Sequence, residues 1–330
     1  MRVLVLTTSY PRGPDDPAGR FVAQAVEAAR ARGVDVEVVS PASFRHFGIP
    51  YGHGIVGNLK TRPWLVLALP AFLWNFRRAA ARHDADLVHA HWLAAGAVAA
   101  TLRPPFVVQV WGTDVELARR ARWLARAVLR RAVFAIGASA FLAERASELG
   151  ARDTRIVPTA VESPDAVGEP DEPPHVLFAG RLSREKGIED FLEATRGLSR
   201  VIVGAGPISV PESLGAVPPR DLGRYYERAA VVCVPSRREG YGMVAREAMG
   251  YGRPVVATPV GGLRDAVEDG VSGLLADRGE LRSAVERLLG DAELRARMGD
   301  TARATARLKW SPEAAADALV DAYDDAVRRA

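Results

Sequence analysis

The sequence predicts an α/β fold made of two doubly wound parallel sheets, one in each half of the chain. Short apolar runs alternate with stretches of helical period along almost all of the 330 residues. Strands separated by helices pair in parallel through right-handed crossovers, which is how doubly wound sheets are built. From 162 to 174 the chain is rich in proline and acidic residues and has little to bury, which is typical of a linker.

The expected strands follow one another regularly. The strands of the first half are predicted at 3–6, 34–39, 86–91, 105–111, 133–139 and 155–159. Those of the second half are predicted at 175–179, 201–203, 231–234, 255–258 and 273–275. The first helix runs from Phe21 to Arg32, where apolar residues recur at helical spacing, and Gly33 stops it. Helices at 280–289 and 292–298 follow the last strand, and Ser311 with Pro312 caps a final helix that reaches 327.

These elements divide the chain into four parts. We expect a Rossmann-like domain over 1–160, a linker over 161–174 and a second Rossmann-like domain over 175–308. A C-terminal helix over 309–330 is expected to pack back on the first domain. Ligands of open α/β sheets bind beyond the carboxyl ends of the strands, so two such sheets facing each other would form one central cleft.

Composition excludes several classes of protein. The chain is 48% hydrophobic and 25% charged, unlike disordered, coiled-coil or collagen sequences. The single cysteine, Cys233, excludes an internal disulfide framework and a cysteine-based metal cluster. The apolar start at 3–6 is too short for a signal peptide, and the longest apolar run, 64–76, is too short to cross a bilayer. We therefore expect a soluble, cytoplasmic protein.

Positive charge is concentrated in the first half. Residues 1–160 hold 21 Lys and Arg against 12 Asp and Glu, a net +9, and the remainder carries a net −5. Two segments, 60–78 and 119–131, combine basic residues with large apolar ones, and six arginines crowd the second. Peripheral contact with an anionic membrane fits these segments, and ordinary amphipathic helices with solvated arginines fit them equally well. A nucleic-acid role is disfavoured, because no recognition motif accompanies the modest basic excess.

The loop over 180–187 is the first candidate site of the second half. Arg181 follows the end of the strand at 175–179, and Lys186 is expected to open the next helix. Two cations that converge at a strand end and a helix N-terminus suit a polyanion such as a diphosphate. A solvated basic turn is the alternative.

A pair of carboxylates forms the second candidate. Glu239 lies in the loop after the strand at 231–234, and Glu247 lies on the helix that follows. Gly240 and Gly242 leave backbone N–H groups unobstructed between them. Carboxylates accept hydrogen bonds from vicinal hydroxyls, so a sugar or ribose is the natural partner. The alternative is an acid near a helix cap and a surface glutamate paired with nearby arginines.

Two glycine-containing turns are weaker signals. Gly13, in the loop after the first strand, suits close approach to a phosphate, and a plain connection explains it equally well. Gly204 and Gly206 begin a glycine turn, but Pro207 follows and no third glycine completes the dinucleotide fingerprint.

The combination of these motifs resembles the retaining glycosyltransferase family 4, which has the GT-B fold. The resemblance rests on FAGRLSREKG (178–187), VGAGP (203–207), the segment from VPSRREGYGMVAREAMG through GVSGLL (234–275) and KWSP (309–312). It implies that Arg181 and Lys186 clamp the diphosphate of a nucleotide sugar, that Glu239 binds the sugar and that Glu247 binds the ribose. The donor-binding residues that it implies are Gly13, Gly180, Gly204, Gly240, Tyr241, Gly242, Met243, Val244 and Glu247.

The first half departs from the family pattern at one place. Where relatives have T-x-H-G-x-D, this chain has QVWGTD over 109–114, so Trp111 replaces the histidine near the reacting sugar. His91, which ends a strand, is then the candidate catalytic histidine. Trp111, Asp114 and His89 are expected on the acceptor side, and a structural role fits His89 almost as well. The segment 206–219 is short and lacks the helix expected after the turn, which leaves the base unspecified.

The resemblance implies transfer of a hexose from a UDP- or GDP-linked donor to an acceptor hydroxyl with retention, an activity of the EC 2.4 class. The acceptor is expected to be a glycolipid, a polysaccharide or a secondary metabolite. No cofactor and no metal are expected, because the cations replace a metal and no Asp-x-Asp motif ends a strand. Peripheral contact at the inner membrane face is a further expectation.

Two alternatives stay open: a non-catalytic nucleotide-sugar-binding protein and a sugar-nucleotide epimerase of the same fold. A phosphorylase would need a pyridoxal lysine, and Lys60, Lys186 and Lys309 offer no good candidate.

Overall fold

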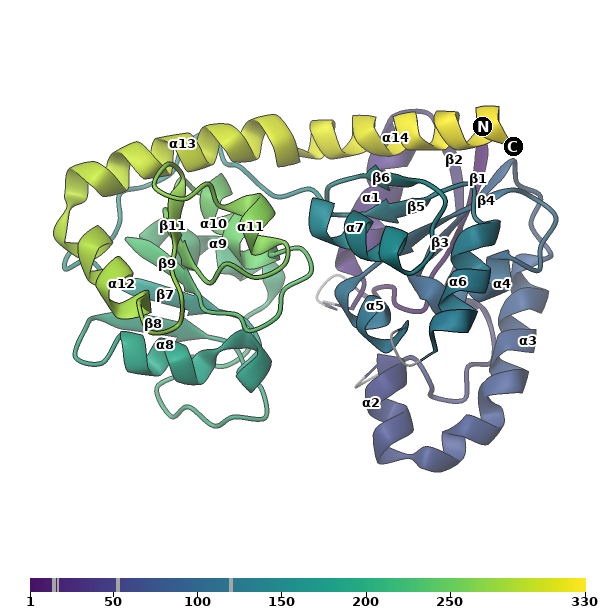
Figure 1. The fold of residues 1–330 in the computed structure, drawn as a ribbon, viewed down its shortest axis with the longest axis horizontal. Helices are drawn as coiled ribbons and strands as arrows, with labels where there is room; N and C mark the ends of the chain where they lie inside the picture. Colours follow the sequence, from purple (N-terminus) through teal and green to yellow (C-terminus); the bar gives the residue numbers. More distant parts are fainter. Residues whose placement is uncertain (14–15, 17, 52–53, 119–120) are drawn as a thin grey trace. The chain divides into compact units, whose positions relative to one another are not determined.

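The computed structural model describes residues 1–13, 16, 18–51, 54–118 and 121–330 (Figure 1). It divides into two compact units. Unit 1 comprises Met1–Ala160 together with Ala315–Ala330, and unit 2 comprises Val161–Ala314. Each unit has its own parallel sheet and its own core.

Unit 1 is built on a six-stranded sheet in the order β2-β1-β3-β4-β5-β6. Its strands are β1 (Arg2–Leu6), β2 (Asp35–Val39), β3 (Leu87–His91), β4 (Phe106–Val110), β5 (Ala135–Gly137) and β6 (Thr154–Ile156). All neighbouring strands pair in parallel. Strands such as β3 and β4 are buried along their whole length, because helices cover both faces of the sheet.

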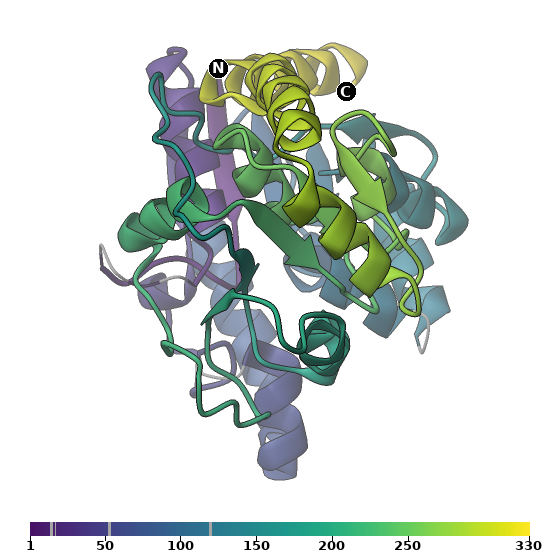
Figure 2. The ribbon, with the colours of Figure 1, turned by 90° about the vertical axis from the view of Figure 1, so that its left-hand side faces the viewer.

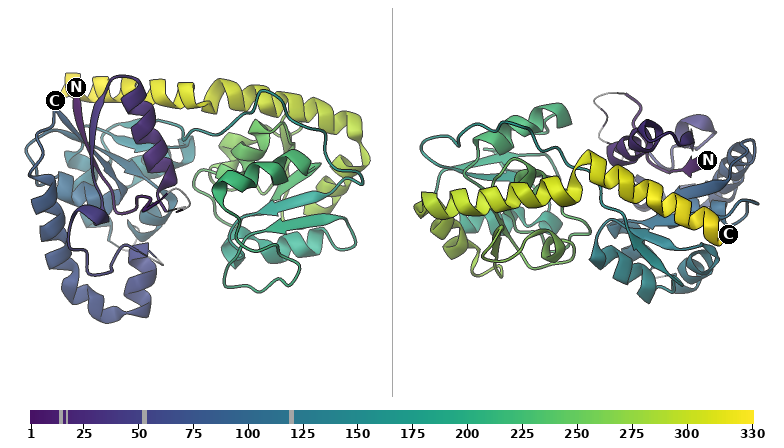
Figure 3. Two further views of the ribbon diagram at one scale, coloured as in Figure 1. Left: turned by 180° about the vertical axis from the view of Figure 1, so that it is seen from behind. Right: turned by 90° about the horizontal axis from the view of Figure 1, so that it is seen from above.

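Most helices of unit 1 cover the two faces of this sheet, whereas α2 packs against the segment after it (Figure 3). They are α1 (Arg20–Ala31), α2 (Gly54–Thr61), α3 (Leu69–Ala80), α4 (Trp92–Ala99), α5 (Gly112–Ala118), α6 (Arg122–Arg131), α7 (Ala140–Glu148) and α14 (Pro312–Arg329). α1 and α14 share one core with Val3 and Val5 of β1, to which α14 contributes Leu319 and Tyr323. α4 packs on β3 and β4 and against α6.

Prolines explain how the long apolar run of unit 1 folds. Pro63 begins a short 3₁₀ helix, η2 (Pro63–Ala68), and Pro70 lies in the first turn of α3. Proline is tolerated at these positions because the first N–H groups of a helix have no intrahelical acceptor. The run from 64 to 76 is therefore two successive helical segments. Among the described residues, no helix combines the length and apolar character that crossing a bilayer requires.

Unit 2 is built on a five-stranded parallel sheet in the order β11-β10-β9-β7-β8 (Figure 2). Its strands are β7 (Val176–Ala179), β8 (Arg200–Val203), β9 (Val231–Val234), β10 (Val255–Ala257) and β11 (Gly273–Leu275). Alternate residues point to opposite faces. Leu177 and Val232 enter one core, and Phe178 and Cys233 enter the other.

The helices of unit 2 cover these two cores. They are α8 (Ile188–Ala194), α9 (Pro219–Arg228), α10 (Met243–Gly250), α11 (Leu263–Ala266), α12 (Leu281–Gly290) and α13 (Ala292–Trp310). α9, α10 and α11 contribute to one core, and α8 and α12 to the other. The predicted helix at 292–298 was too short, because α13 continues through Gly299 to Trp310. A Cβ at Gly299 would lie 2.3 Å from the carbonyl oxygen of Gly252, so this glycine serves close packing and does not end the helix.

The proline-rich segment after β6 contains no helix or strand in the described chain. It belongs to unit 2 and is held by arginines. Arg303 donates to the carbonyl oxygens of Pro164 and Asp165, and Arg228 donates to the carboxylate of Asp171 at 3.0 Å. The segment that composition marked as a linker is therefore fixed to the surface of one unit.

Both sheets have a topological switch point. In unit 1 the order of strands reverses between β1 and β3, and in unit 2 between β7 and β9. Loops that leave neighbouring strands on either side of such a point turn to opposite faces, which opens a crevice at the carboxyl edge. The predicted α/β class, with two doubly wound sheets, is confirmed, and the switch points identify where ligands of such sheets bind.

Candidate functional site

The two predicted donor motifs follow the two strands that flank the switch point of unit 2. The loop over 180–187 leaves β7, and the loop over 235–242 leaves β9. β7 and β9 are neighbours in the parallel sheet, with Val176 paired to Val231. Both loops therefore start from the same edge of the sheet.

Gly187 brings these two loops into contact. It has a left-handed φ of 72°, and a Cβ on it would lie 1.9 Å from the carbonyl oxygen of Pro235. The backbone N–H of Arg237 also donates to the carbonyl oxygen of Glu185 at 2.8 Å. Lys186 lies in a 3₁₀ turn, η3 (Arg184–Lys186), just before α8 begins, so the prediction that it opens the helix itself was wrong by two residues.

Lys186 and Glu239 form an ion pair across the two loops. The Lys186 Nζ lies 2.6 Å from Oε2 of Glu239, and the hydroxyl of Ser236 donates to the same oxygen at 3.4 Å. The Glu239 side chain is 14% exposed and that of Lys186 is 34% exposed. Within the described residues, the other oxygen, Oε1, has no hydrogen-bond partner, so the carboxylate has capacity to accept from a ligand hydroxyl.

Arg181 is an exposed cation in the same loop as Lys186. It follows Gly180 at the end of β7, it is exposed, and in the described part of the chain its side chain makes no hydrogen bond or ion pair. The turn over 203–207 packs against its loop. A Cβ at Gly204 would lie 1.8 Å from the carbonyl oxygen of Gly180, and the N–H of Leu182 donates to the carbonyl oxygen of Ala205 at 3.1 Å.

Glu247 lies on α10, the helix that follows the Glu239 loop. Gly242 is the N-cap of α10, and Met243 and Val244 are its first, half-buried residues. The hydroxyl of Tyr226 on α9 donates to Oε2 of Glu247 at 2.7 Å. Burial, together with the Glu247 charge, holds the pKa of Tyr226 well above its usual value, so the phenol remains a donor.

Arg246 anchors the start of α10 from the inside. Its guanidinium is buried, lies over the ring of Tyr241 at 3.9 Å and over the ring of Trp310 at 4.6 Å. It donates to the carbonyl oxygens of Tyr241 and Gly262. The ring of Tyr241 is therefore buried against Arg246, and a ligand at this loop would contact the backbone of Tyr241.

The predicted histidines lie on β3 at the switch point of unit 1, and both are buried. His89 Nδ1 and the hydroxyl of Tyr323 on α14 share a hydrogen bond of 2.8 Å, and the two imidazole rings lie 4.2 Å apart. Burial lowers the pKa of His89 to about 3. Burial and the neighbouring His89 lower the pKa of His91 well below its usual value. Both imidazoles are therefore neutral near pH 7.

A small cavity of about 30 Å³ lies beside His91 and is also lined by Gln109, Trp111 and Thr159. A volume of this size holds about one water molecule. The His91 Nδ1 has no hydrogen-bond partner among the described residues. His91 thus presents an unsatisfied nitrogen inside unit 1.

Aromatic rings gather around this cavity. Trp111 lies 4.3 Å from Phe21 and is stacked with His91 at 6.2 Å. Trp92, the first residue of α4, has a φ of 70°, which is rare for a bulky residue and is found chiefly where surrounding structure enforces it. This strained residue marks the carboxyl edge of β3.

The structure unites some predicted residues and leaves others separate. Lys186 and Glu239 are in contact, and Gly180, Gly204, Gly240, Gly242 and Glu247 belong to the loops and helix around them in unit 2. His89, His91, Trp111 and Gly13 belong to unit 1, where Gly13 is exposed in the loop after β1. The side chain of Asp114, on α5, and residues 119 and 120 of the basic segment lie outside the described residues.

Sequence reasoning missed four partners. Ser236 precedes Glu239 by three residues, a spacing that signals a local hydrogen bond. Tyr226, Tyr323 and Trp92 give no such signal, because they reach the site through tertiary packing or backbone conformation. Among the described residues, no group of His, Cys, Asp and Glu is arranged to hold a metal ion.

This fold and site define a class: two-sheet α/β proteins with a cation and carboxylates at a switch point, suited to a phosphorylated sugar ligand. Residues 18–161 match the model of a glycosyl transferase 4-like domain, and residues 173–291 match that of glycosyl transferases group 1. A D-inositol 3-phosphate glycosyltransferase of Saccharomonospora viridis is 31% identical over 96% of this chain and 91% of its own. The chain therefore belongs to the GT-B glycosyltransferases of the family 4 type, which confirms the resemblance.

Other relatives match more locally. The α-D-kanosaminyltransferase of Streptomyces kanamyceticus is 36% identical over 46% of each chain, so this chain spans about half of the length of that and similar relatives. Sucrose-phosphate synthase of Thermosynechococcus elongatus superimposes with a TM-score of 0.82 at 21% identity over the whole of both chains. Anabaena HepE in complex with UDP-glucose gives 0.73 at 18% identity, over 98% of this chain and 100% of its own. At these identities the structural likeness shows the fold.

Gly187→Ala is expected to destabilise unit 2 by at least about 2 kcal/mol, because the new Cβ meets the Pro235 carbonyl in a left-handed conformation. Gly197→Ala is the matched control, since Gly197 has a φ of 77° but nothing within 4 Å of its Cβ position. Urea unfolding measures both variants. Equal losses of free energy of unfolding would mean that the contact with Pro235 contributes nothing beyond backbone strain.

Stability is expected to fall as the pH drops below about 6.5, because the unfolded histidines then bind protons that the folded ones do not. The loss for His89 runs from its unfolded pKa near 6.5 down to about 3, at up to about 1.4 kcal/mol per pH unit. His89→Gln should flatten this slope, because glutamine does not bind a proton in this pH range. Urea unfolding at pH 7.5, 6 and 5 checks it; identical slopes for the wild type and His89→Gln would contradict it.

Proposed function

We propose that this protein is a retaining, metal-independent glycosyltransferase that moves a hexose from a nucleoside-diphosphate sugar to an acceptor hydroxyl. The observation that carries the proposal is the contact between Lys186 and Glu239 at the switch point of unit 2. It joins, in one place, a cation suited to phosphate and a carboxylate suited to sugar hydroxyls. Family membership and the match of both domain models support it.

In the proposed donor complex, Arg181 and Lys186 bind the diphosphate. Glu239 accepts from hydroxyls of the sugar through the oxygen that has no partner within the described residues, and Glu247 accepts from the ribose. The backbone of Gly240, Tyr241 and Gly242 and the start of α10 approach the donor, with Gly180, Gly204, Met243, Val244 and Gly13 as further contacts. The donor-binding domain is proposed to span 175–308 and the acceptor-binding domain 1–160, with 309–330 packed back on the latter.

The proposed reaction is a front-face displacement. The bond between the anomeric carbon and the leaving phosphate oxygen breaks, and the bond to the acceptor oxygen forms on the same face of the sugar. The acceptor proton passes to an oxygen of the departing diphosphate. Negative charge grows on that diphosphate in the transition state, so fixed cations at positions 181 and 186 stabilise the transition state more than the ground state.

The remaining assignments follow the same proposal. His91 is proposed to contact the sugar or acceptor, with Trp111, Asp114 and His89 on the acceptor side. A UDP- or GDP-linked sugar is the proposed donor; HepE, which shares the fold, was solved with UDP-glucose. The acceptor is proposed to be a glycolipid, a glycan or a small metabolite. The reaction is placed in the cytoplasm, with peripheral contact at the inner face of the membrane.

A donor screen tests this function. Thermal shift and nucleotide release are measured with UDP-, GDP-, ADP- and dTDP-sugars, with acceptors that include D-inositol 3-phosphate, simple glycosides and lipid-linked sugars. Acceptor-stimulated nucleotide release, with retained configuration at the anomeric carbon by NMR, supports the proposal. Donor binding without release in any acceptor would favour a binding protein, and an altered sugar nucleotide without acceptor would favour an epimerase.

Lys186→Ala is expected to lower kcat/KM roughly 10²–10³-fold, because one charge that stabilises the leaving diphosphate is lost. Arg184→Ala is the matched control, since Arg184 lies on the same 3₁₀ turn, is 76% exposed and pairs with Glu189 at 3.4 Å. Steady-state nucleotide release measures both. Full turnover in the Lys186 variant would contradict the proposed clamp.

Glu247→Gln is expected to raise the donor KM about tenfold or more and to change kcat little, because a charged hydrogen bond to the ribose acts in the ground and transition states alike. Donors with a deoxyribose provide the control. The wild type should discriminate against the deoxy donor and the variant should not. A variant that still discriminates as strongly as the wild type would separate Glu247 from the ribose.

A further inference from the structure

Unit 1 carries an apolar surface on η2 and α3 that its core does not use. The inner side of these segments is fully packed, since Leu65, Phe72 and Phe76 are at most 1% exposed. The outer side consists of large apolar residues that are between 38% and 86% exposed. These five residues, which we call the outer face, are Trp64, Val66, Leu67, Leu73 and Trp74.

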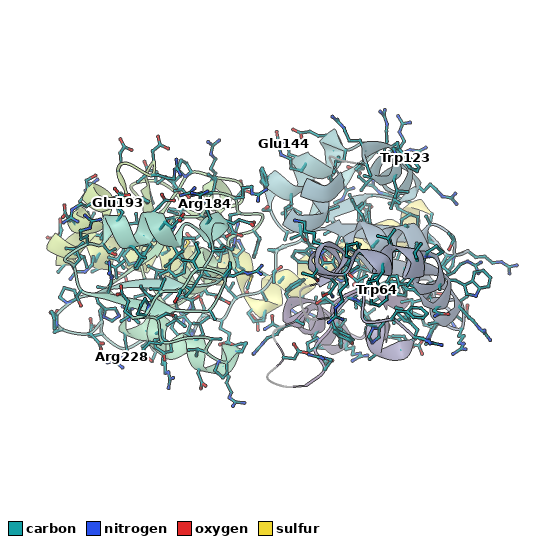
Figure 4. All side chains as sticks on the ribbon, turned by 90° about the horizontal axis from the view of Figure 1, so that it is seen from below. Trp64, Trp123, Glu144, Arg184, Glu193 and Arg228 are labelled. Atoms are coloured by element: carbon teal, nitrogen blue, oxygen red, sulfur yellow. The ribbon has the colours of Figure 1, made fainter. Side chains whose placement is uncertain are left out.

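An ordinary amphipathic helix packed on a sheet does not explain this surface. Such a helix turns polar residues to solvent opposite its buried stripe. α3 buries Phe72 and Phe76, yet exposes Leu73 and Trp74 between them, and Leu67 in η2 is 86% exposed. Five large, exposed apolar side chains within the eleven residues from Trp64 to Trp74 indicate an interaction surface. Trp64 is labelled in Figure 4, which shows the molecule from below.

The charged residues nearest to the outer face in the sequence are all basic. Between Glu37 and Asp84 the sequence has no acidic residue. The same stretch holds six exposed cations, Arg45, Lys60, Arg62, Arg77, Arg78 and Arg82, of which Arg82 lines a pocket with Asp35, Glu37 and Asp84. Lys60 and Arg62 precede the outer face, and Arg77 and Arg78 follow it. Charge complementarity therefore requires an anionic partner.

The combination of exposed tryptophans with flanking cations favours a lipid surface over a protein. Tryptophan rings settle at the boundary between headgroups and acyl chains, and flanking Lys and Arg reach phosphates while their stems stay apolar. A second copy of the chain is disfavoured, because a symmetric contact would bring each basic border against itself.

We propose that the outer face docks unit 1 on an anionic phospholipid bilayer. Trp64, Leu67 and Trp74 insert at the headgroup boundary, and the flanking Lys60, Arg62, Arg77 and Arg78 contact lipid phosphates. The inference deepens the membrane contact in the proposed function by naming its surface and its lipid. Its test measures binding and needs no sugar transfer, so its failure and a failure of the proposed activity are distinguishable.

Co-sedimentation of the full chain with vesicles tests the proposal. Vesicles of 30% phosphatidylglycerol in phosphatidylcholine are compared with pure phosphatidylcholine, at low and high salt. Binding is expected to the anionic vesicles and to weaken with salt. Arg77→Gln with Arg78→Gln should weaken it about 30-fold, which corresponds to roughly 1 kcal/mol per charge. The triple variant Trp64→Ser, Leu67→Ser, Trp74→Ser should weaken it at least about tenfold.

Trp123→Ser is the matched control. Trp123 on α6 is also in unit 1, is 76% exposed and follows Arg122. Its loss should leave vesicle binding within about twofold of the wild type. Thermal unfolding and circular dichroism check that each variant is folded.

Tryptophan fluorescence supplies a second measurement. Brominated lipids should quench the wild type and should quench it much less after Trp64→Phe with Trp74→Phe. The proposal is overturned if the wild type ignores anionic vesicles, if the triple variant binds like the wild type, or if Trp123→Ser costs as much as the triple variant. A concentration-dependent dimer that the triple variant abolishes, without vesicle binding, would assign the outer face to a second copy instead.

Discussion

The close approach of Gly187 to the carbonyl of Pro235 is the constraint on which the proposed donor site depends. β7 and β9 set two loops at one edge of the sheet, but strand pairing alone leaves the distance between their side chains open. The absent Cβ lets the backbone of one loop rest on the other, and only then does the Lys186 ammonium reach Glu239 at 2.6 Å. Only glycine fits at position 187 without a clash, and the resulting contact between the two loops positions Lys186.

The side chains at the two switch points differ in charge. In unit 2, Arg181 is exposed and the Lys186–Glu239 pair is partly so, which suits a charged ligand that must enter and leave. In unit 1, His89 and His91 are buried and neutral among aromatic rings, and Tyr323 fixes one of them from the C-terminal helix. A neutral imidazole can donate one hydrogen bond and accept another without adding charge. The edge in unit 2 therefore suits charged ligand groups, and the edge in unit 1 suits uncharged ones.

The strands were predictable because buried parallel strands are continuous apolar runs, and each expected run corresponds to a strand of the structure. Motif residues were predictable where chain neighbours carry the geometry, as with Gly242 and Glu247. What sequence could not supply were contacts made by packing: Tyr226 reaches Glu247 from α9, and Tyr323 reaches His89 across 234 positions of chain. The end of α13 was predicted too early because glycine usually disfavours a helix. Here Gly299 lies inside the helix and allows close packing against the carbonyl of Gly252.

The ion pair with Glu239 orients the Lys186 ammonium in the absence of a ligand and is weak enough for a ligand to replace. Partly exposed pairs contribute only about 0–1 kcal/mol, because solvent screens them. Exchanging the carboxylate for a doubly charged diphosphate therefore costs little, and the ligand gains a charge-assisted hydrogen bond from an ammonium already in position. In the proposed donor complex, Oε2 of Glu239 keeps the hydrogen bond from Ser236, and Oε1 accepts from the sugar. A stronger, fully buried pair would resist that exchange, and an unpaired lysine would lose side-chain entropy on binding.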